Sequence, residues 1–464
     1  MSKHLTEKTF YHYVKCPSWV YFNAHEAEKT HDALLTRLMD DGLLPEMQRE
    51  MLRDRDFVEV EHEDQEQAYL RTLELMRAGT QTILNGVLMH GHWIGHPDIL
   101  ERVEGRSGFG NYYYIACDIK RNRHMQDVYK FQGAFYAELL KLIQAVKPTQ
   151  GYVMTPDAEV QSYFLDEFEV EFHLTLEEIE KILAGQRPPH FLTSGCKQSP
   201  WFEACRGESL VCDDLSLINR VWRSEVEALN RAQIHTVSQL SMSDPDLLAA
   251  KIPAVSRDRL HHLRMQATAL SEGRTIVMQS VPFPSATTEL YFDIESSPVR
   301  DLEFMFGVLV VEKGKETYHS FVAKKPEEEG EAWKSFLTFI KTYPEAPIYH
   351  FGWYEIEVMK RMSAKYGEVD LVEKIIASQM HDLLIMIRDA ILFPLHFYSL
   401  KDIAKLLGFS WRGAEASGVN AVVWYEQYLK TRRKAKLQAI IDYNEDDCRA
   451  TFVVKKWVAE KAGE

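Results

Sequence analysis

The chain has 464 residues, 45% of them hydrophobic and 27% charged, and its formal net charge is −15 at pH 7. This length exceeds that of one ordinary domain, so we expect two or three domains with separate cores. The acidic balance excludes a general polyanion-binding protein, but a local basic patch or a bound divalent metal would still permit contact with nucleic acid.

The sequence also bears on localisation. No apolar run approaches the roughly 20 residues that a membrane-spanning helix needs. The first residues, "MSKHLTEKTFYHYVKC", contain no apolar core typical of a signal peptide. We therefore expect a cytoplasmic protein without a membrane partner, whose six cysteines are thiols or metal ligands rather than disulfides.

The first part of the chain, residues 1–215, alternates predicted helices with short strands. The aromatic and β-branched stretch "GNYYYIACDIKRNR" (110–123) predicts a strand. The stretch "DVYKFQGAFYAELLKLIQAV" (127–146) has helical spacing, which places Gln132 and Tyr136 on one face.

An acid and a lysine lie two residues apart on the predicted strand. Asp118 and Lys120 share a face, because strand side chains alternate, and Asp98 follows a Gly-His-Pro turn some way earlier. An exposed Asp-x-Lys pair is commonly only a small ion pair. With a second carboxylate, however, such a pair can hold a metal while the lysine activates water or neutralises developing charge.

The middle of the chain is predicted to be helical. Two helix-like runs lie on either side of "KIPAVSRDR" (251–259), and the turn-rich stretch "SEGRTIVMQSVPFPSATT" (271–288) is predicted to be a linker. We expect a helical module with its linker at 216–283 and a further domain at 284–464.

Strands and helices alternate again in this last part. Three consecutive strands are predicted, namely "ELYFDIESS" (289–297), "FMFGVLVVE" (304–312) and "TYHSFVAK" (317–324). Three helices are predicted, namely "EAWKSFLTFIKTY" (331–343), "YEIEVMKRMSAKY" (354–366) and "KLQAIIDYNEDDCRATFVVKKWVAEK" (436–461). The expected fold class is therefore a multi-domain α/β protein.

Carboxylates gather in three places of this last part. Asp293 and Glu295 point to the same face of their strand, where they repel unless a divalent cation lies between them. Glu355 lies where a strand leads into a helix. Four carboxylates around two metals about 3.5–4 Å apart would suit in-line attack on a phosphodiester.

The fourth acid is chosen from the helix that carries "DYNEDDCRAT". Residues four apart share a face, so Tyr443 and Asp447 are neighbours on the apolar stripe. Asp442, Asp446 and Arg449 lie on another stripe, which is predicted to be solvated. Asp447 is therefore the predicted metal ligand, with Tyr443 orienting the attacking water. The alternative is a set of surface acids beside a core tyrosine.

The order Asp293-x-Glu295, Glu355, Tyr443-x3-Asp447 resembles the DEDD exonucleases of the RNase H-like fold, with glutamate in place of the usual third aspartate. The stretches "HDLLIMIRD" and "FYSLKDIAKLLGF" are similar to the YprB-like ribonuclease H branch. This resemblance implies a mixed-sheet RNase H-like domain at 284–464 that binds Mg²⁺ or Mn²⁺ through the four acids. Asp382 is a lesser candidate, as an acid that supports the site.

The N-terminal constellation resembles the PD-(D/E)xK nucleases, in particular the RecB-like branch with its Gln-x3-Tyr helix. This resemblance implies that residues 1–215 form a restriction-endonuclease-like α/β domain. It also implies that Asp98 and Asp118 bind metal and that Lys120 is catalytic. Gln132 and Tyr136 would support the site or the DNA backbone.

One position departs from that pattern. Relatives place a histidine ligand on an early helix, in a Gly-x-x-His-Glu context, where "DGLLPE" has Pro45 and Glu46 instead. We expect either that Glu46 substitutes as a ligand or that the N-terminal site binds metal weakly.

The cysteines resemble the iron–sulfur clasp of RecB-like nucleases of the CRISPR-associated kind, which combines one early cysteine with three late ones. Here the early residue is Cys16, and the late ones are Cys196, Cys205 and Cys212. Ser199 replaces the second late ligand, and serine is a poor ligand for iron–sulfur centres. Either Cys212 completes an iron–sulfur cluster or the cluster is lost and the cysteines remain as a packed staple.

Two further stretches bear on nucleic acid. The middle module resembles tandem helix–hairpin–helix modules, but its hairpin "IPAVS" lacks their glycines, so it either binds phosphate or serves as a spacer. The basic run "KTRRKAK" (430–436) either follows a nucleic-acid backbone or is a solvated helix start.

Taken together, the parts resemble RecB-family nucleases that join a RecB-like domain to an RNase H-like exonuclease domain. This implies metal-dependent hydrolysis of DNA, at single-stranded or frayed ends, in repair, recombination or defence, with a separate helicase as a partner. The alternatives are a non-catalytic nucleic-acid-binding or assembly factor with degenerate nuclease folds, and an RNase.

Overall fold

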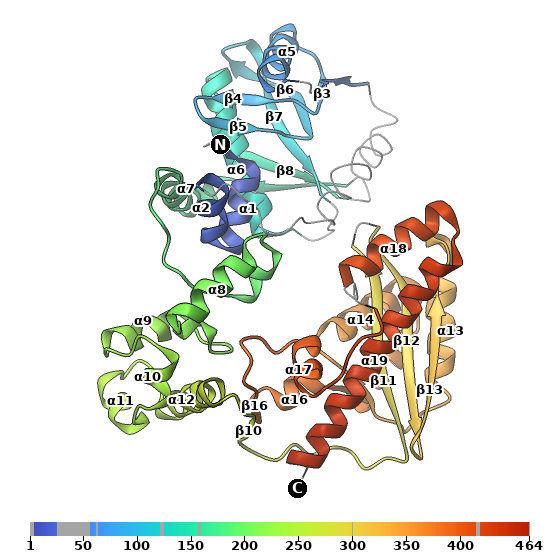
Figure 1. The fold of residues 1–464 in the computed structure, drawn as a ribbon. Coiled ribbons are helices and arrows are strands. Elements are labelled where there is room, and N and C mark those ends of the chain that lie inside the picture. The colour runs from blue at the N-terminus through green and yellow to red at the C-terminus, as the bar shows by residue number, and fades with distance from the viewer. Residues whose placement is uncertain are drawn as a thin grey trace. The chain divides into compact units, whose positions relative to one another are not determined.

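The computed structural model describes residues 4–25, 56–61, 64–120, 125–155, 159–298, 300–413 and 418–463. It divides into two compact units, residues 1–207 and 208–464, which are described separately (Figure 1). The mixed α/β architecture expected from the sequence is confirmed, with mixed sheets in both units. Among the helices described, none is both long and apolar enough to cross a membrane.

The first unit is built on a six-stranded mixed sheet. Its order is β2 (Val58–Glu59), β3 (Thr82–Leu84), β6 (Ile99–Ser107), β7 (Gly110–Ile119), β8 (Gln150–Met154) and β9 (Val160–Phe164). A small second sheet joins β1 (Leu5–Thr6), β5 (Trp93–Gly95) and β4 (Leu88–His90). The predicted strand at 110–123 is confirmed as β7, which pairs antiparallel with β6 and parallel with β8.

Helices pack against these sheets around a large apolar core. They are α1 (Glu7–Lys15), α2 (Pro17–His25), α5 (Gln65–Ala78), α6 (Asp127–Gln144) and α7 (Glu169–Leu183), and α8 (Phe202–Cys212) crosses into the second unit. Helix α6, predicted at 127–146, contacts β7 and β8 and also packs against α1. These contacts bring the start of α1 close to the strand that carries Asp118.

The second unit begins with α9 (Arg223–Arg231), α10 (Val237–Ser241), α11 (Pro245–Lys251) and α12 (Arg257–Glu272). The strand β10 (Ile276–Val277) then pairs with β16 (Ile391–Leu392), which ties this stretch to the rest of the unit. A separate middle domain stays a prediction.

A five-stranded mixed sheet follows, in the order β13 (Lys315–Val322), β12 (Leu302–Glu312), β11 (Thr288–Ser297), β14 (Ile348–His350) and β15 (Met380–Asp382). The three predicted strands are confirmed as β11, β12 and β13 (Figure 1). Lys313 and Gly314 join the last two with φ angles of 48° and 80°. Two positive φ angles in a two-residue connection are typical of hairpin turns that match strand twist.

The helices that follow the first strands of this sheet are α13 (Glu329–Ile340), α14 (Tyr354–Tyr366), α15 (Val369–Ser378), α16 (Leu383–Ile387), α17 (Leu400–Leu406), α18 (Gly418–Thr431) and α19 (Lys434–Ala462). The two faces of β11 have different partners. Phe292 stacks on Phe336 of α13, with ring centroids 4.8 Å apart. Tyr291 faces the other way and meets Phe452 of α19 at 5.2 Å. Asp293 and Glu295 alternate with the same period as Tyr291, so they face α19.

Candidate functional site

Three carboxylates meet between β11 and α19. Asp293 and Glu295 come from the strand and Asp447 from the helix, and carboxylate oxygens of the three lie within 4.8 Å of one another. Glu295 and Asp447 are buried, and Asp293 is half-buried. Strand alternation and the helical period thus place these three predicted residues together.

Burial and mutual repulsion disfavour three negative charges here. Burial, followed by the charge of Asp447, holds the pKa values of Asp293 and Glu295 well above their ordinary range. Burial likewise raises the pKa of Asp447 to about 6. A cation that replaces the protons would remove this cost, and clustered carboxylate oxygens are the ligands that Mg²⁺ and Mn²⁺ prefer. The donor set therefore fits a hard divalent metal.

Glu355, the second residue of α14, lies just outside the tight group. Its side chain is buried, and its charge contributes to the raised pKa values of both β11 acids. Its Oε2 atom lies 3.5 Å from Nδ1 of the buried His350 on β14. Neither this Oε2 nor either ring nitrogen of His350 has a hydrogen-bond partner among the described residues. Glu355 therefore acts electrostatically on the acid cluster, and its Oε2 beside His350 is still able to accept.

Tyr443 lies one helical turn before Asp447, as predicted. Its ring lies under the ammonium of Lys401, with Nζ 4.7 Å from the ring centroid. Burial and then the charge of Asp447 raise the pKa of the Tyr443 hydroxyl. The phenol therefore keeps its proton and can act as a hydrogen-bond donor beside the acids.

Asn444 is a site residue that the sequence patterns missed. Its Nδ2 donates to Asp293 at 2.7 Å and to Glu295 at 3.4 Å, so it fixes both strand carboxylates. Its Oδ1 accepts from the hydroxyl of Tyr318 at 2.8 Å. The amide lies against Gly307, where a Cβ atom would come within 1.6 Å of Asn444 Oδ1. The signal available in the sequence was the asparagine that directly follows Tyr443.

Lys401 and Trp411 were also missed. Burial lowers the pKa of Lys401, although the charges of Asp447 and Glu295 oppose that effect. The indole Nε1 of Trp411 donates to Asp447 Oδ1 at 2.7 Å. Both residues lie in or near "FYSLKDIAKLLGF", but nothing in that stretch indicates which acids it contacts.

Asp446 corrects the sequence interpretation. It was predicted to be a solvated surface acid, but its side chain is 4% exposed. Its two oxygens accept from the backbone N and from Nε of Arg412, each at 2.8 Å. The segment that follows α17 covers this stripe of α19, so a position that would be solvated on an isolated helix becomes part of an ion pair.

Asp382, the lesser candidate, has a local structural role. It caps α16 by accepting from the backbone N of Ile385 at 3.3 Å, and it also accepts from the backbone N of Gly352 at 3.0 Å. These contacts hold the loop before α14, which carries Glu355.

The predicted residues of the first unit also converge. Asp98 Oδ2 accepts from the backbone N of Ile119 at 2.6 Å. Lys120 Nζ lies 2.7 Å from Asp118 Oδ2 and donates to Gln132 Oε1 at 2.8 Å. The hydroxyl of Tyr136 lies 3.5 Å from Asp118 Oδ2. Burial, and then the charge of Asp118, raises the pKa of Asp98 to about 7.

A further acid, Glu7, lies beside this group. It begins α1, is buried, and accepts from the backbone N of His96 at 3.2 Å. Its charge contributes to the raised pKa of Asp98. Glu46, the predicted ligand, lies outside the described residues. Within the described part of this unit, the acids near Lys120 do not form a group as tight as the one between β11 and α19.

Among the residues described in the first unit, Glu138, Glu169 and His173 also have metal-ligand side chains close together. Lys147 Nζ lies 2.7 Å from Glu138 and 2.9 Å from Glu169. A lysine already neutralises these acids, so we assign them to an ion-pair cluster.

Three of the four predicted cluster cysteines lie in the same region. Cys196 Sγ is 3.4 Å from Cys16 Sγ, and the nearby Cys205 contributes to a raised pKa of Cys16. Cys212, at the end of α8, is exposed. Ser199 is buried, and its Oγ accepts from the backbone N of Trp201 at 3.1 Å. An iron–sulfur cluster stays a prediction.

Comparison with known families supports an assignment for the second unit. No curated protein matches the chain. Residues 290–459 match the family model of the RNase_H superfamily, and this range contains the acids of β11, α14 and α19. RNase H-like nucleases usually work with Mg²⁺ or Mn²⁺, in keeping with the acid cluster. The C-terminal part of the chain therefore carries an RNase H-like domain, which indicates a metal-dependent nuclease.

Proposed function

We propose that the RNase H-like domain is a metal-dependent exonuclease that hydrolyses DNA from single-stranded or frayed ends, in repair, recombination or defence. The observation that carries the proposal is the convergence of Asp293, Glu295 and Asp447 in a buried cluster, where the charge of Lys401 offsets only part of the cost of burial and repulsion. Such a cluster is unfavourable by itself and becomes favourable with divalent metal.

Each residue of the cluster has a distinct part in this proposal. Asp293, Glu295 and Asp447 would hold Mg²⁺ or Mn²⁺, with Glu355 as the adjacent fourth acid. The bound metal would supply an activated water and stabilise the leaving oxygen. Tyr443, which keeps its proton, donates to and orients that water. Asn444 keeps the two strand carboxylates in place through its Nδ2.

The basic run at 430–436 supports contact with a nucleic-acid backbone. It joins the end of α18 to the start of α19, and its residues are exposed except for the half-buried Lys436. Its positive charge contrasts with the net −15 of the whole chain. Local clusters of this kind can hold phosphates on an acidic protein. A separate helicase would supply single strands, since the proposal requires them.

The deciding experiment offers the purified chain, in an Asp118→Asn, Lys120→Ala background that removes the other candidate centre, end-labelled single-stranded and double-stranded DNA and RNA, and a circular single strand, with Mg²⁺ or Mn²⁺. We expect stepwise shortening of linear single-stranded DNA, no cutting of the circle and no reaction with a chelator. Cleavage of the circle would refute the exonuclease assignment. Preference for RNA would favour an RNase, and no cleavage at all would favour a non-catalytic binding protein.

A second nuclease centre in the first unit is supported by one specific observation. Lys120 lies between Asp118 and Gln132, with Asp98 held at the same place by the backbone of Ile119. A lysine beside two acids suits metal-assisted hydrolysis of a RecB-like kind. Activity that survives Asp447→Asn and disappears with Asp118→Asn would support this centre.

A further inference from the structure

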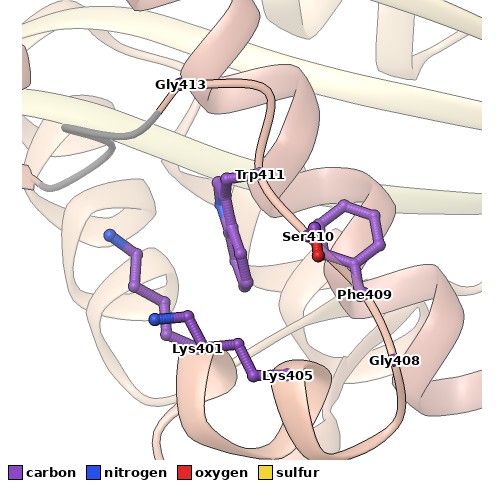
Figure 2. Close-up of a pocket in the computed structure, with 7 residues that line it drawn as sticks. All are labelled: Lys401, Lys405, Gly408, Phe409, Ser410, Trp411 and Gly413. Carbon is purple, nitrogen blue, oxygen red and sulfur yellow. The ribbon is translucent and has the colours of Figure 1, made fainter.

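A cavity of about 370 Å³ opens beside the acid cluster of the RNase H-like domain. Its described walls are the helix α17, through Lys401 and Lys405, and the following segment, through Phe409 and Trp411 (Figure 2). Its volume lies toward the lower end of the roughly 300–1,000 Å³ typical of small-ligand sites. It is large enough for a group such as a nucleotide.

The walls combine aromatic surface with positive charge. The rings of Phe409 and Trp411 meet edge to face, with centroids 4.9 Å apart and an interplanar angle of 89°. Lys401 Nζ lies 5.8 Å from the Trp411 ring, and in Figure 2 the indole lies between the lysine side chains and Phe409. Two ammonium groups favour an anion, and a partly exposed indole favours a flat ring.

The cavity is connected to the acids by direct contacts. The indole of Trp411 is held by its hydrogen bond to Asp447 Oδ1 at 2.7 Å. Lys401 lies over the ring of Tyr443 as well as near Trp411. A ligand in the cavity would therefore lie next to the cluster, on a ring whose orientation is already fixed.

We propose that this cavity is a nucleotide subsite of the nuclease, in which the base next to the scissile phosphate stacks on Trp411 and a phosphate contacts Lys401 and Lys405. The inference rests on the proposed nucleic-acid hydrolysis and adds how the strand is held. Stacking on an aromatic ring accepts any base, because every base has a π-face, so the subsite recognises single strands without sequence preference.

The test measures binding of the full chain to short labelled single strands, in DNA and RNA arms, with a chelator present so that nothing is cut. Each strand is prepared intact or with one abasic position, at either end or in the middle. For the wild-type chain, the abasic change at one end should weaken binding about 5- to 150-fold, the range expected from loss of one stacked base. Trp411→Leu should weaken binding of the intact strand similarly and abolish sensitivity to the abasic change.

Matched variants separate the contributions. Trp411→Phe loses the bond to Asp447 but keeps an aromatic ring, so it should remain sensitive to the abasic position. Lys405→Ala should weaken binding of intact and abasic strands alike and reduce the salt dependence. Lys334→Ala, which removes the same charge from the exposed face of α13, should change neither.

The proposal is overturned if the wild-type chain binds intact and abasic strands equally, if Trp411→Leu keeps its sensitivity, or if Lys405→Ala behaves like Lys334→Ala. If the chain cuts nucleic acid but gives any of these results, the subsite proposal is refuted and the nuclease proposal stands. If the chain binds as predicted but cuts no strand with Mg²⁺ or Mn²⁺, the binding subsite stands and the nuclease proposal is refuted.

Discussion

Neighbouring acids on α19 should separate catalysis from stability. Asp447 belongs to the acid cluster, whereas Asp446 is ion-paired with Arg412. Replacing each in turn by asparagine keeps the shape and removes one negative charge. We predict that Asp447→Asn abolishes hydrolysis without destabilising the fold, and that Asp446→Asn destabilises the fold with little loss of activity.

The magnitudes follow from the surroundings of each acid. A pKa of about 6 for Asp447, in place of 3.8, corresponds to about 3 kcal/mol of unfavourable ionisation at neutral pH. Asp447→Asn should therefore leave the metal-free protein as stable as wild type or up to about 2–3 kcal/mol more stable. Its hydrolysis rate should fall by roughly a thousandfold or more, because a metal ligand is lost.

Asp446→Asn removes the anion that accepts from Arg412. The Arg412 side chain is 48% exposed, so solvent screens part of this interaction. We expect a loss of about 1–2 kcal/mol in the free energy of unfolding and a rate within about tenfold of wild type. Glu460→Gln, at an exposed acid of the same helix, is the control, and it should change stability by less than about 0.5 kcal/mol.

The rates are measured with end-labelled strands in an Asp118→Asn, Lys120→Ala background, so that the other candidate centre cannot hide a loss. Urea denaturation without metal gives the free energies of unfolding. Our assignment is refuted if Asp446→Asn is inactive at wild-type stability while Asp447→Asn is active.

Three further predictions concern metal and packing. The raised pKa of Asp447 contributes stability that is fully present below about pH 4 and is lost as pH rises through about 6. The increase in Tm caused by Mn²⁺ should therefore be larger at about pH 8 than at about pH 5, and an equal increase would contradict this. Gly307→Ala should displace Asn444 and reduce hydrolysis at least as much as Asn444→Ala does, because the added Cβ occupies the position of the amide oxygen. A wild-type hydrolysis rate for Gly307→Ala would show that β12 shifts to make room for the Cβ, and would contradict the prediction. The first unit should bind metal more weakly than the second and prefer Mn²⁺ to Mg²⁺. Calorimetry on the full chain measures the first unit's site in Asp447→Asn and the second unit's site in Asp118→Asn, and equal Mg²⁺ affinities would refute the prediction.

Local periodicity was sufficient to predict much of the acid cluster. Asp293 and Glu295 needed only strand alternation, and Tyr443 and Asp447 needed only the helical period. The expected strands at the start of the RNase H-like domain were also confirmed, because β11 and β12 are rich in aromatic and β-branched residues, and β12 is an almost continuous buried apolar run.

The rest of the site depends on tertiary contacts that no local pattern contains. Asp446 looked solvated on an isolated helix, and only docking of the segment with Arg412 buries it. Trp411 reaches Asp447 because that same segment lies over α19. In the first unit, Glu7 joins the acids through the packing of α1 against α6, across more than half the length of that unit.

The acid cluster joins β11 to α19, and the hydrogen bond from Asn444 to Asp293 closes a loop of 151 residues. Contacts between such distant residues require a large loss of chain entropy, so they tend to form late during folding. Asp293 and Glu295 of β11 therefore meet Asp447 only when α19 docks on the sheet. A partly folded chain would hold an incomplete set of ligands, and the ability to cut would appear together with the finished fold.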